Sequence, residues 1–205
     1  MALVNHERKF IFLMEPHTAS RAVVAATQAQ IPGTSQVGHH HISMDHLLDW
    51  RRQHLDPKMV KDYRIIATVR NPFETLVTRY RSQANWNDKS IDEFVTTGWE
   101  TSQAATSYGL HESATHFVWY EDIQDDLRWL FTQPDFDLGY DESHKTPNKK
   151  YWVDYFQTET IEKLLGRPDW MSYLQKYGYG VYMDAMVGYR IKIVNSIRAS
   201  LCRPL

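Results

Sequence analysis

Three apolar runs in this sequence are each followed within a few residues by a helix-forming segment, and this alternation most constrains the fold. The runs cover residues 9–14, 64–69 and 115–120, and a weaker run covers 35–42. Short continuous apolar runs are typical of strands buried on both faces. Strands separated by helices indicate a parallel sheet with helical cover. We therefore expect an α/β fold with a central parallel sheet of about four to five strands.

Helix patterns follow each of these strands and fill the C-terminal part of the chain. The first helix, over residues 20–30, follows a polar turn and stops at the Ile-Pro-Gly of 31–33. Further helices are expected over 43–55, 73–83, 91–99, 121–131, 151–165, 168–176 and 181–201. The C-terminal part is thus predicted to be helical.

The chain length of 205 residues suits one domain, and 42% hydrophobic residues exclude a disordered chain. We expect a single domain over residues 1–205. Residues 9–130 would form a nucleotide-binding sheet core, and residues 131–205 a loop and closing helices.

Charge and cysteine content limit the partners and the compartment. The formal net charge is −2, so the chain has no overall basic field that would attract nucleic acid. Cys202 is the one cysteine, which excludes an intrachain disulfide and a cysteine-based zinc site. No run approaches the ~20 apolar residues of a membrane span, and the first ten residues carry charges. We expect a soluble cytoplasmic protein with neither nucleic acid nor membrane as partner.

The turn after the first strand has the residue types of an anion site. A strand-to-helix turn offers backbone N–H groups and the positive end of a helix to an anion. This turn lacks glycine, but Ala19 and Ser20 are small enough for close approach, and Thr18 and Ser20 add hydroxyl donors. His17 and Arg21 are its basic side chains. The alternative is an ordinary turn with an incidental histidine.

A second anion site is predicted after the strand at 64–69. Arg70 follows that strand directly, and a guanidinium can contact a phosphate with two parallel hydrogen bonds. Thr78, on the following helix, can add a hydroxyl. The alternatives are a salt bridge for Arg70 and an ordinary helical threonine at 78.

These segments resemble the sulfotransferases that use 3′-phosphoadenosine 5′-phosphosulfate (PAPS). Three blocks carry the resemblance, in the family's order. They are "FLMEPHTASRAV", similar to the 5′-phosphosulfate loop, "IIATVRNPFETLVTRYRS", similar to the 3′-phosphate element, and "FVWYEDIQDDLRWLF", similar to the Tyr-Glu-Asp strand-to-helix junction. A weaker likeness over 149–179 is to the closing helices of the carbohydrate (Golgi-type) branch. Together the blocks touch most of residues 9–179.

The resemblance implies a P-loop-like phosphate turn at 16–21 and cofactor binding by His17, Thr18, Ala19, Ser20, Arg21, Arg70 and Thr78. The family usually has lysine where this sequence has His17. Histidine, with an ordinary pKa of about 6.5, keeps only part of its charge at pH 7, although a bound dianion would raise that pKa. No metal is required by the reaction.

The run "GHHHIS" resembles the His-x-His-Val-Ser pattern of heparan 2-O-sulfotransferases. It implies His41 as general base and His39 as orienting residue or second candidate, with His17 also in the catalytic set. The alternatives are polar residues at a strand end or metal ligands. No carboxylate or cysteine stands at a familiar ligand spacing from the run.

The prediction is therefore a PAPS-dependent sulfotransferase that transfers a sulfuryl group in line to an acceptor hydroxyl, with PAP as product. The acceptor would be a small molecule or a saccharide. The alternatives are a non-catalytic protein that binds PAP or a sulfated glycan, a P-loop-like nucleotide kinase, or an interaction domain without a small ligand. Lys145, Lys149 and Lys150 form a basic loop that either lies near the site or is simply solvated.

Overall fold

The computed structural model describes residues 2–14, 18–37, 61–82, 89–97, 111, 114–139, 152–184 and 188–193. The chain forms two compact units. The first unit comprises Met1–Val69 and Tyr108–Lys145, and the second comprises Arg70–Ser107 and Thr146–Leu205.

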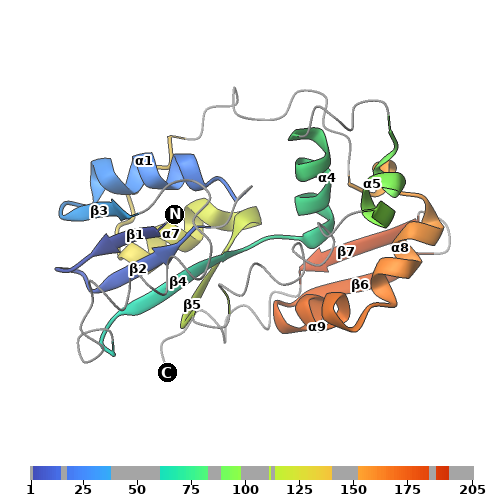
Figure 1. Ribbon diagram of the computed structural model, residues 1–205. Helices are drawn as coiled ribbons and strands as arrows, with labels where there is room; N and C mark the ends of the chain where they lie inside the picture. Colours follow the sequence, from blue (N-terminus) through green and yellow to red (C-terminus); the bar gives the residue numbers. More distant parts are fainter. Residues whose placement is uncertain are drawn as a thin grey trace. The chain divides into compact units, whose positions relative to one another are not determined.

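A five-stranded mixed sheet forms the first unit (Figure 1). The strands lie in the order β3-β1-β2-β4-β5. Their bounds are β1 Ala2–Asn5, β2 Phe10–Leu13, β3 Thr34–Val37, β4 Arg64–Val69 and β5 His116–Trp119. The chain is thus an α/β protein, as the alternation of strands and helices predicts.

One strand breaks the parallel order. β2 pairs in parallel with β4, and β4 with β5, whereas β1 is antiparallel to both of its neighbours, β2 and β3. β1 and β2 are joined by a tight turn in which Lys9 has φ 51°, and a hairpin connection forces antiparallel pairing. It follows from the pairings that β2, β3, β4 and β5 all run in one direction. Their carboxyl ends therefore share one edge of the sheet.

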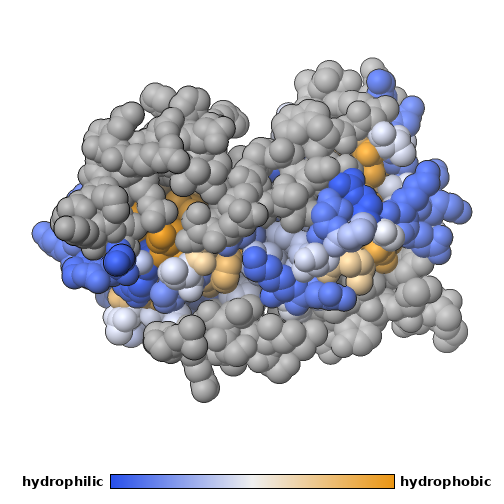
Figure 2. Space-filling view, turned by 60° about the horizontal axis from the view of Figure 1, so that its bottom comes forward, coloured by the Kyte–Doolittle hydropathy of each residue, from blue (hydrophilic) through white to orange (hydrophobic). Residues whose placement is uncertain are grey.

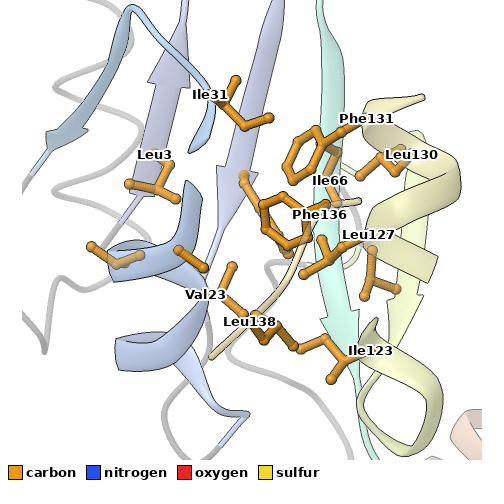
Figure 3. Packing of buried hydrophobic residues seen from close by; sticks show 14 of the residues in the cluster. Leu3, Val23, Ile31, Ile66, Ile123, Leu127, Leu130, Phe131, Phe136 and Leu138 are labelled. Carbon is orange, nitrogen blue, oxygen red and sulfur yellow. The ribbon is translucent and has the colours of Figure 1, made fainter. Parts of the chain in front are cut away.

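Side chains alternate between the two faces of this sheet. Phe10 and Phe12 of β2 belong to one apolar cluster, and Ile11 and Leu13 belong to another. The first cluster packs the sheet against α1 (Ser20–Gln30) and α7 (Ile123–Phe131), which cover the same face (Figures 1 and 3). Figure 3 shows Val23 of α1 and Leu127 of α7 pointing toward the sheet residue Ile66 and toward Phe136. This core fixes where both helices begin relative to the strands.

Two arginines satisfy the end of α7. A helix leaves its last carbonyl groups without intrahelical partners. Arg8 Nη1 donates to Phe131 O at 3.3 Å, and Arg64 Nη1 donates to Leu130 O at 2.8 Å. Thr132 then ends the helix in the left-handed conformation, with φ 52°.

The second unit contains helices and a two-stranded sheet. Its helices are α4 Pro72–Ser82, α5 Ile91–Thr97, the 3₁₀ turn η5 Trp152–Tyr155, α8 Thr158–Leu165 and α9 Pro168–Lys176. Phe73 of α4 is its packing centre. The ring stacks on Trp152 with centroids 4.5 Å apart and meets the edge of Trp170 at 4.9 Å and of Phe156 at 5.6 Å.

The helix expected over 181–201 is wrong. β6 (Tyr179–Asp184) and β7 (Gly188–Ile193) form an antiparallel pair instead, with Asp184 opposite Gly188 and Tyr179 opposite Ile193. Within this segment, Tyr189, Ile191 and Ile193 alternate with Arg190 and Lys192, and aromatic and β-branched residues at a period of two favour a strand. The apolar positions of this segment also fit the 3.6-residue period of a helix, and for that reason a helix was predicted.

The coloured part of the face in Figure 2 is largely hydrophilic, with small separate apolar areas. Trp129 of α7, half exposed at 50%, is the exposed large apolar side chain of the described residues. No helix within the described ranges is both long and apolar enough to cross a membrane.

Candidate functional site

The predicted phosphate turn leads from β2 to α1 at the carboxyl edge of the first unit's sheet. Thr18, the first described residue of this turn, is buried with only 1% of its surface exposed. Its neighbour Ala19 packs against the core cluster shared by α1 and α7. Thr18 and Ala19, directly before α1, are thus packed into the core.

A buried hydrogen bond ties this turn to the neighbouring strand. Thr68 Oγ1 of β4 donates to Thr18 Oγ1 at 2.9 Å, and both residues are at most 1% exposed. The contact holds the Thr18 hydroxyl at the start of α1, against the strand β4.

His111 extends this contact. Its Nε2 lies 2.7 Å from Thr68 O, and because a carbonyl only accepts, Nε2 carries the proton and donates it. His111 is 5% exposed and meets Phe117 edge to face, with centroids 5.6 Å apart. Thr68 is therefore held at two atoms, its main-chain carbonyl by His111 and its hydroxyl by Thr18.

The amino end of α1 has no side-chain cap from its N-cap residue. Ala19 is its N-cap, with φ 55° and no side-chain cap hydrogen bond, and the first turn holds no acidic residue. The backbone N–H groups of that turn have no capping side-chain oxygen from Ala19, and the helix dipole makes them a positive end. Ser20 is the first helical residue and half-buried, whereas Arg21 is exposed.

The second predicted anion site consists of Arg70 and Thr78, which belong to the second unit. Both residues contact Glu74. Arg70 Nη2 lies 3.7 Å from Glu74 Oε2, with 5% and 19% of these side chains exposed. Thr78 Oγ1 donates to Glu74 O at 2.9 Å. A phosphate bound by Arg70 would compete with the Glu74 carboxylate, and Thr78 would have to turn its O–H away from the helix to donate to it.

Asn71, between Arg70 and α4, has a structural role. Asn71 Oδ1 accepts from Phe73 N at 3.0 Å, and Thr75 N donates to Asn71 O at 3.0 Å. An asparagine that accepts from the second residue beyond it is a typical helix cap. This cap starts α4 directly after Arg70 and leaves that arginine in the short connection between β4 and the helix.

A hollow of about 480 Å³ lies beyond the end of β5. Its lining includes Tyr120, Gln124 and Leu138 together with four acidic residues: Glu121, Asp122, Asp125 and Asp137. Carboxylates repel phosphate, so this hollow does not suit a nucleotide phosphate. Nearby, Asp126 Oδ2 accepts from Trp119 N at 2.8 Å, which connects the start of α7 to the last residue of β5.

Several predicted site residues lie outside the described residues. They are His17, His39, His41, Lys145, Lys149 and Lys150. Within the part of the chain that is described, no group of three or more His, Cys, Asp and Glu side chains is arranged to hold a metal ion.

Sequence reasoning missed Thr68, His111 and Glu74. The signal for Thr68 is a hydroxyl residue inside the otherwise apolar strand "RIIATV". Glu74 stands four residues after Arg70, the spacing of an ion pair on one helix face. His111 has no local signal, because its partner Thr68 is 43 residues away.

The fold and this edge of the sheet define the class of the chain as α/β. Comparison of the chain with protein-family models, with curated proteins and with solved structures found no match.

Proposed function

We propose that this chain is a PAPS-dependent sulfotransferase. The observation that carries the proposal is the junction from β2 to α1, where a buried Thr18 hydroxyl and an uncapped helix end lie beside the parallel strand β4. Backbone N–H groups, a hydroxyl proton and a helix dipole are what an anionic phosphosulfate needs. Arg70, the residue after β4, supplies a cation at the start of the second unit.

In this proposal the turn of residues 16–21 is P-loop-like and holds the 5′-phosphosulfate. Thr18 and Ser20 donate from their hydroxyls, and His17 and Arg21 balance the charge. Arg70 and Thr78 bind the 3′-phosphate after Glu74 has been displaced from the guanidinium. Charge held in this way stabilises the transferring group as charge develops on the leaving phosphate oxygen.

His41 would act as the base, oriented by His39. Neutral His41 takes the proton of the acceptor hydroxyl while the acceptor oxygen bonds to sulfur. The bond from sulfur to the 5′-phosphate oxygen breaks, and PAP leaves with that electron pair. A histidine suits this role because its neutral form is common near pH 7. The acceptor is a small molecule or, by the resemblance of the closing segment, a saccharide.

The direct test is a titration with PAP while the melting temperature is followed. A ligand at ~100 times its dissociation constant adds about 2.7 kcal/mol to the free energy of unfolding. A melting-temperature rise with PAP supports the proposal. A rise only with ATP and Mg²⁺ contradicts it and favours a nucleotide kinase.

Transfer itself is tested with labelled PAPS and a panel of saccharide and small hydroxylic acceptors. His41→Ala should abolish transfer while PAP affinity stays near wild type. The matched control is His40→Ala, since the strand that the sequence predicts over 35–42 would put residue 40 on the opposite side from 41. A His41→Ala variant with wild-type turnover would remove His41 from the mechanism.

A non-catalytic PAP- or glycan-binding protein is the second candidate. Two observations favour it: histidine stands at 17 where the resembled family has lysine, and the Glu74 carboxylate lies 3.7 Å from Arg70. PAP binding without transfer to any acceptor would support this candidate over the enzyme.

A further inference from the structure

The hydroxyl of Tyr173 contacts both main-chain polar groups of Arg70. Tyr173 Oη donates to Arg70 O at 3.1 Å, and Arg70 N lies 3.5 Å from the same oxygen as donor. Tyr173 is on α9, 103 residues further along the chain, and both residues are 5% exposed. One buried hydroxyl is therefore placed against the backbone of the predicted phosphate-binding arginine.

Position 70 needs such a contact. β4 ends at Val69 and α4 begins at Pro72, so Arg70 is in neither element. A buried backbone N–H or C=O outside regular structure must find another partner, because an unsatisfied one costs roughly 1–3 kcal/mol. A tyrosine hydroxyl can donate and accept at once, and Tyr173 does both for the same residue. It therefore holds the backbone of Arg70 where the strand and the helix do not.

Packing holds Tyr173 in turn. Its ring meets the ring of Tyr177 edge to face, with centroids 4.7 Å apart. One turn earlier on α9, Trp170 meets Phe73 of α4 at 4.9 Å. Helix α9 therefore makes two contacts in this region. Trp170 packs on Phe73 at the start of α4, and Tyr173 bonds to the backbone of Arg70.

We propose that Tyr173 is a positioning residue that sets the direction of the Arg70 guanidinium for anion binding. Fixing the backbone of residue 70 restricts where its side chain starts, and a bidentate phosphate contact tolerates little misplacement. The inference rests on the proposed function only for the identity of the anion. The placement of Arg70 can be measured without any ligand.

The test uses the full chain and the variant Tyr173→Phe, which removes only the hydroxyl. We expect the dissociation constant for PAP to rise about tenfold and the Arg70 amide to exchange its hydrogen at least tenfold faster. The control is Tyr155→Phe in the same unit, which loses an exposed hydrogen bond that Arg81 Nη1 donates to Tyr155 Oη at 3.0 Å. It should change neither quantity. A merely structural role for Tyr173 would lower the melting temperature without this selective effect on residue 70.

A double-mutant cycle tests whether Tyr173 acts through Arg70. It adds the single variant Arg70→Ala and the double variant Arg70→Ala/Tyr173→Phe. If Tyr173 acts through Arg70, removing its hydroxyl in the Arg70→Ala background will not weaken PAP binding further. Equal weakening in both backgrounds overturns the inference, as does a Tyr173→Phe protein with wild-type PAP affinity and wild-type exchange at residue 70.

A wild-type chain that does not bind PAP would contradict the proposed function and leave the exchange measurement to decide the role of Tyr173. Faster exchange confined to residue 70 and its neighbours then supports positioning, and unchanged exchange overturns it. If Tyr173→Phe does not fold, the wild-type protein decides. Protection of the Arg70 amide, outside any strand or helix, supports the contact, and rapid exchange there overturns it.

Discussion

Thr68 Oγ1 donates a hydrogen bond to Thr18 Oγ1 across 2.9 Å, at a place where both side chains are almost completely buried. The bond joins β4 to the beginning of α1. The Thr18 hydroxyl is therefore held in place by the strand beside it.

Replacing Thr68 by valine should lower the free energy of unfolding by about 1–3 kcal/mol. The shape is kept, but the Thr18 hydroxyl loses its buried donor, and an unmade buried hydrogen bond costs that much. Urea unfolding of the two single variants, Thr18→Val and Thr68→Val, and of the double variant measures the coupling. The double variant should lose clearly less than the sum of the two, because the pair is then apolar on both sides. Strict additivity would show that the two hydroxyls do not interact.

Glu74→Gln should strengthen anion binding at Arg70. The substitution removes the negative charge 3.7 Å from the guanidinium that a phosphate has to displace. We expect the dissociation constant for PAP to fall about three- to tenfold, equivalent to roughly 0.7–1.4 kcal/mol, measured by calorimetry. Glu159→Gln, at an exposed position of α8, is the control for net charge. If both variants gain alike, a general field effect is responsible and not Glu74.

Leu127→Ala should be among the most destabilising changes in the first unit. Leu127 is fully buried in the cluster between α7 and the sheet, and leucine-to-alanine changes in such cores cost about 2–5 kcal/mol. Trp129→Ala on the same helix removes a larger but half-exposed side chain and should cost much less. Comparable losses for the two variants, measured by denaturant unfolding, would contradict the described orientation of α7.

His116 should contribute to loss of stability in mild acid. Burial, and secondarily the charge of Arg64, lower the pKa of His116 below its ordinary value of 6.5. The unfolded chain therefore takes up a proton before the folded chain does, so stability rises with pH in this range and falls as pH drops below about 6.5. His116→Gln cannot titrate, and its stability should fall less between pH 7 and pH 5 than that of the wild type. Parallel pH profiles of the two proteins, followed by urea unfolding, would disprove this.

Local sequence was sufficient for the elements whose pattern is long and uniform. The strand over 64–69 and the helix over 20–30 have the predicted bounds, because an apolar run and an alanine-rich segment ending at Ile-Pro-Gly leave little choice. β1 escaped prediction because four residues are too few for a period to appear. Its place in the sheet depends on pairing with β3, about 30 residues further on.

The candidate site, too, could be predicted from local sequence only in part. The uncapped amino end of α1 and the position of Arg70 after β4 follow from local patterns. The bond from Thr68 to Thr18 does not, because it depends on the pairing of β2 with β4, in which Leu13 lies opposite Ala67. Contacts set by strand register join residues some 50 positions apart, and no local spacing records them.

β1 is flanked on both sides by hydrogen-bonded partners, although it lies within the first few residues of the numbering. Deleting residues 2–5 would remove an interior strand of the sheet and not an edge strand. It would leave β3 without the strand to which it is paired. Loss of strand pairing should instead begin at β3, the edge strand of the described sheet, whose Ser35 and Gln36 face solvent.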